Sequence, residues 1–137
     1  MAAMVGYSAT PLWKKLGVTA GSRVWTQNAP AEYAAWIEPL PPNAKVSARL
    51  RASVDIAHLF VDRRRELLRL LTIAMERVGP HGAIWVSWPK KASRVPTDMT
   101  EDVIREVALP LGLVDIKVCA VSEVWSGLKL VVRKELR

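Results

Sequence analysis

The stretch from Val54 to Lys91 constrains the fold more than any other part of the chain. Residues 54–61 (VDIAHLFV) form a continuous apolar run of strand length, and residues 83–88 (AIWVSW) form a second one. Between them, apolar residues recur at helical spacing over 67–78. Gly79-Pro80 ends this helix, since glycine accepts a left-handed turn and proline cannot continue the hydrogen-bond ladder. Strand, helix and strand in this order predict two parallel strands, and their apolar character on both faces places them inside a covered sheet.

The composition is that of a globular protein. Of the 137 residues, 50% are hydrophobic and 24% are charged, which predicts a single domain over 1–137 with a lead-in segment over 1–20. No apolar stretch approaches the roughly 18 residues of a membrane span, and the first residues lack the pattern of a signal peptide. Cys119 is the only cysteine, so an intrachain disulfide is excluded and a reducing cytoplasm is the expected location.

The net charge of +7 favours an anionic partner, such as a nucleotide, a nucleic acid or an acidic protein. The lysines and arginines are spread along the chain, without the run of five or six like charges that is typical of a nucleic-acid-binding arm. A small anion or a protein is therefore the expected partner, and nucleic acid rests on charge alone.

The residues before the central unit predict a strand and a helix but leave one segment undecided. Residues 22–27 (SRVWTQ) have the pattern of a strand, and a helix is expected from about Asn28 to Glu38, with Pro30 in its first turn. Residues 45–50 (KVSARL) alternate as a strand does. Three residues, reaching roughly 10 Å, separate them from Val54, too few for a helical crossover between parallel strands. The segment is therefore an antiparallel edge strand or an irregular excursion.

The residues after the central unit predict a helix and a hairpin. Thr100 is the expected cap of a helix, as Asp62 is for the helix of the central unit. Residues 114–121 alternate between two faces, and residues 128–134 (LKLVVRK) form a last strand close enough to pair with them as an antiparallel hairpin.

The order of these elements carries a resemblance to a known fold. The segments that carry it are residues 54–59 (VDIAHL), residues 80–86 (PHGAIWV) and the hairpin over 114–133. Parallel strand–helix units closed by such a hairpin resemble the C-terminal half of class I, S-adenosylmethionine-dependent methyltransferases. In that fold the last strand inserts antiparallel beside the strand that follows the central unit. The resemblance implies a three-layer, Rossmann-like α/β fold, with a mostly parallel sheet of five or six strands, helices on both faces and a C-terminal antiparallel β-hairpin.

A set of short motifs carries a second resemblance, which runs nearly end to end. The motifs are Gly6-Tyr7-Ser8, Thr10-Pro11-Leu12, Lys15-Leu16-Gly17, Trp88-Pro89-Lys90-Lys91, Thr97-Asp98, Leu113-Val114-Asp115, Lys117-Val118-Cys119-Ala120-Val121 and Trp125-Ser126-Gly127-Leu128. In these motifs the chain resembles a family of short bacterial proteins known only as a domain of unknown function. This resemblance implies a fold, but it implies no enzymatic activity.

The chain departs from the methyltransferase pattern where that pattern carries chemistry. A Rossmann-type cofactor site needs glycines after the first strand, and here the turn reads Gln27-Asn28-Ala29-Pro30. An acidic residue is expected beyond the second strand to hold the ribose hydroxyls, and here Arg49 and Arg51 follow it. One strand–helix unit is also missing. S-adenosylmethionine is therefore disfavoured, and no cofactor is predicted.

The carboxyl ends of the parallel strands are the expected ligand-binding edge, because ligands of open α/β sheets bind there. A phosphate or carboxylate held by lysine and hydroxyl groups is the chemistry we expect, and a solvated loop is the alternative. The candidate ligand-binding residues are Gln27, Asn28, Trp88, Lys90, Lys91, Ser93, Arg94 and Thr97.

No residue of the chain is assigned a catalytic or metal-binding role. His58 lies in the middle of a strand, which favours a hydrogen-bonded core histidine over a base. The two histidines and the cysteine have no metal-ligand spacing, and Cys119 on a strand is expected to be a small buried hydrophobe.

These observations predict a non-catalytic binding or regulatory module with a reduced methyltransferase-like scaffold, which docks an anionic ligand or partner. A methyltransferase-like enzyme that uses S-adenosylmethionine is the second hypothesis, and a nucleic-acid-binding protein is the third. The chain is expected as a monomer, or as a homodimer if the edge at 45–50 or the hairpin pairs with a second copy.

Overall fold

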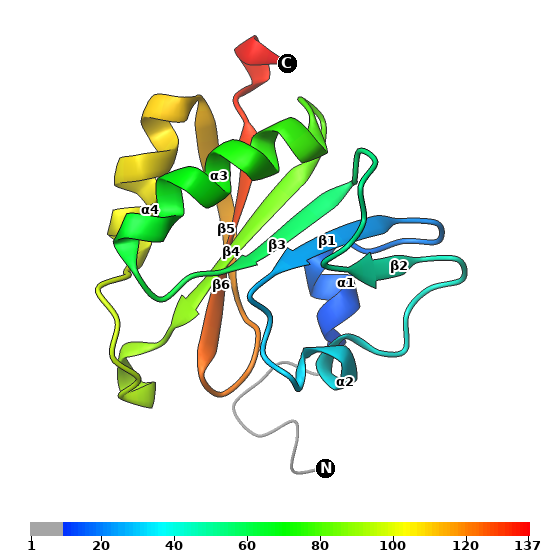
Figure 1. The fold of residues 1–137 in the computed structure, drawn as a ribbon, viewed down its shortest axis with the longest axis horizontal. Coiled ribbons are helices and arrows are strands. Elements are labelled where there is room, and N and C mark those ends of the chain that lie inside the picture. The colour runs from blue at the N-terminus through cyan, green and yellow to red at the C-terminus, as the bar shows by residue number, and fades with distance from the viewer. Residues whose placement is uncertain (1–9) are drawn as a thin grey trace.

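The computed structural model describes residues 10–137, so the motif Gly6-Tyr7-Ser8 lies outside the described residues. The sheet has six strands, in the order β2-β1-β3-β4-β6-β5, and helices pack on both of its faces (Figure 1). The strands are β1 (Arg23–Gln27), β2 (Lys45–Ser47), β3 (Ile56–Phe60), β4 (Ala83–Pro89), β5 (Leu113–Ala120) and β6 (Trp125–Val132). Strands β2, β1, β3 and β4 are parallel, while β6 runs antiparallel to β4 and β5. The predicted three-layer, mostly parallel α/β fold is confirmed.

The helices divide into two pairs, one pair for each face of the sheet. They are α1 (Leu12–Leu16), α2 (Tyr33–Ile37), α3 (Arg64–Val78) and α4 (Glu101–Ala108), and short 3₁₀ turns cover Lys91–Ser93, Leu109–Leu111 and Lys134–Leu136. Buried residues of α3 and α4 form one apolar cluster with the sheet, and those of α1 and α2 form the other. We call these two sides the α3/α4 face and the α1/α2 face. Within residues 10–137, no helix combines the length and apolar character that crossing a membrane requires.

The central unit of β3, α3 and β4 has the predicted form. All five residues of β3 are buried, and β4 pairs with it in parallel from Ile56–Ala83 to Phe60–Ser87. The helix ends at Gly79, whose φ of 66° lies in the region that glycine tolerates. Trp85 and Trp88 lie on opposite faces, since Trp85 belongs to the α1/α2 cluster and Trp88 to the α3/α4 cluster.

The segment at 45–50 is a parallel strand, so the expected antiparallel or irregular arrangement is wrong. Strand β2 ends at Ser47 and pairs in parallel with β1. Because β2 and β3 flank β1 on opposite sides, residues 48–55 cross over β1 as irregular chain with a turn at Ala48 and Arg49, without a helix. The indole N–H of Trp25 donates to the carbonyl oxygen of Ala48 at 3.2 Å, and the guanidinium of Arg77 donates to that of Leu50. Side chains of β1 and α3 therefore hold the backbone of this crossover in place, where a parallel crossover usually contains a helix.

Two expected helix starts are also wrong. The helix expected from Asn28 begins at Tyr33. Asp62 does not cap α3, since the backbone N–H of Arg64 donates to Oδ1 of Asp98 at 2.7 Å, a carboxylate from a distant loop. The expected cap of α4 is confirmed, because Oγ1 of Thr100 accepts from the backbone N–H of Val103 at 3.1 Å.

The C-terminal hairpin places the last strand inside the sheet. Strand β6 follows β5 in the chain yet lies between β4 and β5, and pairs antiparallel with both. This is the insertion that the resemblance to methyltransferases implied. Gly127 of β6 faces Trp85 and Ser87, and an added Cβ atom would lie 3.3 Å from the Trp85 ring. The close approach of β6 to β4 therefore favours a residue without a side chain at this position.

Candidate functional site

The carboxyl edge of the parallel strands contains the switch point of the sheet. Strand β1 ends there at Gln27, β3 at Phe60 and β4 at Pro89. The chain leaves β1 toward α2 on one face and leaves β3 toward α3 on the other. Divergent connections of this kind open the crevice in which ligands of doubly wound folds bind. The carboxyl edge between β1 and β3 is therefore the candidate site.

The turn after β1 is closed by the protein's own polar groups. Asn28 has a φ of 62°, a left-handed conformation that asparagine tolerates better than most residues with a side chain. Its Nδ2 atom makes a long hydrogen bond of 3.5 Å to the carbonyl oxygen of Phe60 at the end of β3. The amide of Gln27 donates to the carbonyl oxygen of Thr26 at 2.9 Å. The turn thus has the tight geometry that a glycine would supply, but a side chain spans the space between the two strands.

The loop after β4 is held by hydroxyl groups that were predicted to bind a ligand. The hydroxyl of Ser93 donates to the carbonyl oxygen of Lys90 at 2.6 Å, within one turn of 3₁₀ helix. The hydroxyl of Thr97 donates to the carbonyl oxygen of Asp62 at 2.7 Å, which ties this loop to the turn after β3. Both hydroxyls therefore have structural partners, and their predicted role in ligand binding remains a prediction.

Three basic side chains stand at this edge of the sheet. Arg63, Lys91 and Arg94 are exposed, and none of them forms an ion pair within residues 10–137. Arg63 is the N-cap residue that precedes α3, and the Thr97–Asp62 hydrogen bond holds the loop carrying Lys91 and Arg94 against that turn. We call these three residues the basic rim. Their positive charges are exposed to solvent, with the exposed carboxylates of Asp62 and Asp98 in the adjoining turns.

The predicted site residues do not form one continuous cluster. Gln27 and Asn28 end β1 and Lys90 follows β4, with β3 between these strands, so about 10 Å separates the two groups. Trp88 is only 8% exposed and packs in the α3/α4 cluster. Of the predicted residues, Asn28, Lys91 and Arg94 are exposed, and Arg63 joins the last two in the basic rim without having been predicted.

A buried polar network lies on the α1/α2 face beneath this edge. Nδ1 of His58 lies 2.8 Å from the hydroxyl of Tyr33, and Nε2 lies 2.7 Å from the hydroxyl of Ser87. The His58 ring also stacks on Phe60, with ring centroids 4.4 Å apart. Burial lowers the pKa of His58 to about 3, so the imidazole is neutral, and burial raises the pKa of Tyr33. The predicted core histidine is confirmed, and its inaccessibility gives it a structural role.

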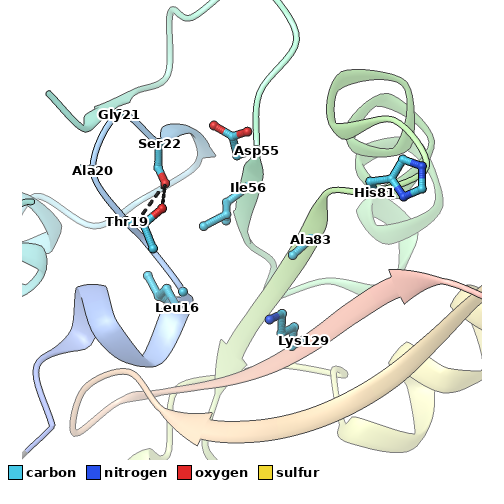
Figure 2. A pocket seen from close by; sticks show the side chains of 11 residues that line it. Leu16, Thr19, Ala20, Gly21, Ser22, Asp55, Ile56, His81, Ala83 and Lys129 are labelled. Carbon is cyan, nitrogen blue, oxygen red and sulfur yellow. Dashed lines mark hydrogen bonds between the residues drawn. The ribbon is translucent and has the colours of Figure 1, made fainter.

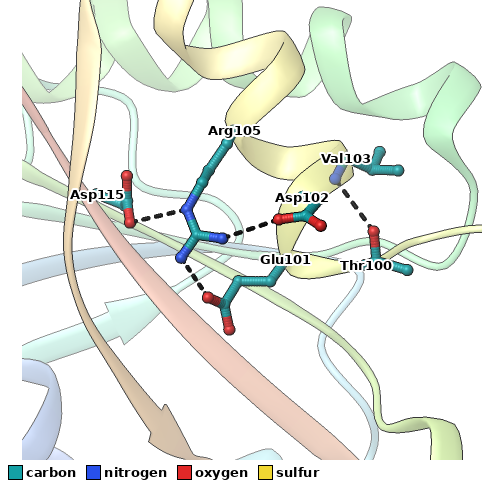
Figure 3. A network of polar contacts seen from close by, with 6 residues as sticks. All are labelled: Thr100, Glu101, Asp102, Val103, Arg105 and Asp115. Atoms are coloured by element: carbon teal, nitrogen blue, oxygen red, sulfur yellow. Dashed lines mark hydrogen bonds and ion pairs between the residues drawn. The ribbon is translucent and has the colours of Figure 1, made fainter.

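A second charged cluster joins α4 to the hairpin (Figure 3). The guanidinium of Arg105 contacts the carboxylates of Glu101, Asp102 and Asp115, at 3.1 Å for the two aspartates. These hydrogen bonds to Glu101 and Asp115 raise the pKa of Arg105. Glu101 and Asp102 lie in the first turn of α4, as expected of acids that oppose the helix dipole. The acids of this cluster stabilise the helix and its contact with β5.

The chain carries little else that resembles a reactive centre. In the part that the structure describes, no group of three histidine, cysteine, aspartate or glutamate residues is placed to hold a metal ion. Cys119 is half-buried, and burial raises the pKa of its thiol, which disfavours the nucleophilic thiolate.

The fold is that of Rossmann-like, methyltransferase-type α/β proteins. A S-adenosylmethionine-dependent methyltransferase from Aquifex aeolicus superposes with a TM-score of 0.65 at 15% identity, over 92% of this chain and 90% of that one. The fibrillarin pre-rRNA processing protein of Methanococcus jannaschii gives 0.63 at 10% identity, over 96% and 73%. A protein of the NADB-Rossmann superfamily from Streptococcus agalactiae gives 0.58 at 12% identity, over 91% and 69%. No family model and no curated protein matches the chain. At these identities the likeness shows the fold alone.

The residues at the switch point do not fit S-adenosylmethionine well. The turn from Gln27 to Pro30 has no glycine, and the Asn28 side chain bonds to the carbonyl oxygen of Phe60 at the end of the adjacent strand. Beyond β2 the chain continues through Ala48 and Arg49, with no carboxylate placed to accept from ribose hydroxyls. A cofactor at this edge would therefore lack both the close backbone approach and the acidic partner that Rossmann-type sites provide.

Proposed function

We propose that the chain is a non-catalytic binding module built on a methyltransferase-type scaffold. Its partner is anionic and docks on the basic rim of Arg63, Lys91 and Arg94. The observation that carries the proposal is the closed turn after β1, where Asn28 bonds to Phe60 across the switch point. A catalyst of this fold needs that space for its cofactor, whereas a module that binds at the surface does not.

Methyl transfer from S-adenosylmethionine is the second candidate, and the fold comparisons taken alone favour it over the first. They include a S-adenosylmethionine-dependent methyltransferase that this chain matches over nine-tenths of both lengths. Binding of the cofactor here requires the Asn28 side chain to leave the crevice. The two candidates thus differ in a single property, the affinity of the chain for S-adenosylmethionine.

A calorimetric titration with S-adenosylmethionine and with tripolyphosphate separates the candidates. We expect no heat of binding with S-adenosylmethionine and a measurable one with tripolyphosphate, which weakens in the double variant Lys91→Ala, Arg94→Ala. Lys45→Ala is the matched control, because Lys45 is exposed on β2 and away from the rim. Saturable binding of S-adenosylmethionine that persists in the double variant would establish the second candidate and remove the first.

Nucleic acid is a third partner class that the same basic rim could serve. Phosphate contacts release counterions when they form. The logarithm of the binding constant for a short single strand would therefore fall linearly with the logarithm of the salt concentration, with a slope of about 0.7 for each phosphate contact. Repeating the titration with a short single strand at two salt concentrations measures that slope.

A further inference from the structure

A hollow lies at the opposite, amino edge of the parallel strands. It has a volume of about 360 Å³ and is bounded by the loop between α1 and β1, the starts of β3 and β4, and β6 (Figure 2). Its polar lining comes from Thr19, Ser22, Asp55, His81 and Lys129. This volume is within the range of small-molecule sites, about 300–1,000 Å³. The hollow is separate from the basic rim, since the two lie at opposite ends of the same strands.

The basic end of the hollow is formed by Lys129, and a second lysine stands beside it on the neighbouring strand. Lys129 of β6 lies directly opposite Lys117 of β5, and both point to the α1/α2 face. Neither forms an ion pair within the described residues, and residues 1–9 contain no aspartate or glutamate. Like charges placed opposite each other across two strands destabilise a sheet. The pair therefore concentrates positive charge that no ion pair neutralises within residues 10–137.

Lys129 is the lysine that reaches into the hollow. Figure 2 shows its side chain extending toward Leu16 and Ala83, and its Nζ lies 4.0 Å from the position that a Cβ atom on Gly17 would occupy. Partial burial, and then the charge of Lys117, lower the pKa of Lys129. An anionic group bound beside Nζ would raise this pKa again, because its charge stabilises the ammonium form.

The other end of the hollow accepts hydrogen bonds. Oδ2 of Asp55 accepts from the backbone N–H of Arg23 at 2.8 Å, and Oδ1 has no partner within residues 10–137. The hydroxyls of Thr19 and Ser22 lie 3.1 Å apart beside it. A carboxylate with one free oxygen favours a hydroxyl or amino donor on the ligand and disfavours a second anionic group.

We propose that this hollow binds a small metabolite with an anionic group at one end and hydroxyl or amino donors at the other. The anion lies beside Lys129, and the donors reach Asp55 and Ser22. Either a phosphate or a carboxylate can provide the negative charge beside Lys129, and the experiment below distinguishes these two groups. The proposal does not depend on the function assigned to the basic rim.

An NMR titration that follows backbone amide signals tests the proposal. The probes are glycerol 3-phosphate, L-serine, inorganic phosphate and glycerol. We expect saturable shifts at Gly21, Ser22 and Ala83 with glycerol 3-phosphate or L-serine, and at least tenfold weaker binding with inorganic phosphate and glycerol, which carry only half of the required groups. The stronger of the first two probes identifies phosphate or carboxylate as the anion.

Variants connect the binding to the hollow. Lys129→Met is expected to weaken binding at least tenfold, while Lys91→Ala at the basic rim leaves it unchanged and so keeps this site distinct from the proposed function. If Lys129→Met does not fold, Ala83→Leu, which fills the hollow without removing a charge, takes its place. Unchanged affinity in the variant, no saturation with either probe, or shifts confined to the residues around Lys91 would each overturn the proposal.

Discussion

The buried imidazole of His58 predicts an acid-sensitive stability of calculable size. Burial lowers the pKa of His58 to about 3 in the folded protein, whereas an unfolded histidine has a pKa of about 6.5. Well above pH 6.5 the residue is neutral in both states, and its titration adds nothing to the pH dependence of stability. As the pH falls below 6.5, the unfolded state binds a proton that the folded state does not, so stability decreases down to about pH 3.

The magnitude follows from the width of this window. At about pH 5.0 the unfolded histidine lies 1.5 units below its pKa, which corresponds to about 2 kcal/mol at 1.36 kcal/mol per unit. For a chain of 137 residues this lowers the melting temperature by about 7 °C relative to about pH 7.5. Aspartates and glutamates titrate mainly below this range, so histidine is the side-chain type to which the interval from about pH 7.5 to 5.0 is most sensitive.

Urea unfolding at a series of pH values measures the effect, and two variants identify its source. His58→Gln keeps a donor and an acceptor for Tyr33 and Ser87 but cannot titrate, so its stability should change little over the interval. His81→Gln is the matched control, since His81 is exposed and its variant should keep the full slope. A wild-type slope in His58→Gln, or its loss in His81→Gln, would refute the assignment.

Three further substitutions test local features of the fold. A Cβ atom on Gly82 would lie 2.7 Å from the backbone oxygen of Val78, so Gly82→Ala should lower the free energy of unfolding by about 1–3 kcal/mol in urea titrations, and an unchanged value would contradict this packing. Thr100→Ala removes the cap that accepts from Val103 and should lower it by about 1 kcal/mol, with Thr100→Asn as the rescuing control. Arg105→Met should lower the urea midpoint in low salt and by less in about 1 M NaCl, because salt screens the ion pairs it removes; equal losses would mean that packing of the side chain dominates.

The parts of the fold that the sequence predicts correctly are those whose signal is local and long. Strands β3 and β4 are continuous apolar runs, and α3 between them keeps its period over fifteen residues. Strand β2 is three residues long and pairs with the edge of β1 that faces away from β3. Its direction therefore depends on a pairing between distant segments, which no local sequence pattern reveals. The cap of α3 was missed for the same reason, because Asp98 lies 34 positions from Arg64.

The candidate sites show the same division. His58 was predictable as a core residue from its place in an apolar strand, but its partners Tyr33 and Ser87 lie 25 and 29 positions away. The sequence predicts a ligand-binding role for Lys90, Lys91 and Arg94 because they follow an apolar strand. The hollow beside Lys129, in contrast, exists only because β6 inserts next to β4. Trp88 was placed in the site because it ends an apolar strand, but alternation along β4 turns its ring into the core.

The position of β6 also sets an order for the assembly of the sheet during synthesis. Strand β5 emerges from the ribosome before β6 but has no other partner in the sheet, and β4 has an unsatisfied edge until the same strand arrives. A nascent chain that stops before Trp125 can form the parallel half of the sheet, yet β5 remains without backbone hydrogen-bond partners. The last long-range pairing therefore waits for residues 125–132, and a ribosome paused just before them holds a chain with an open strand edge, which is the state most exposed to aggregation and to chaperones.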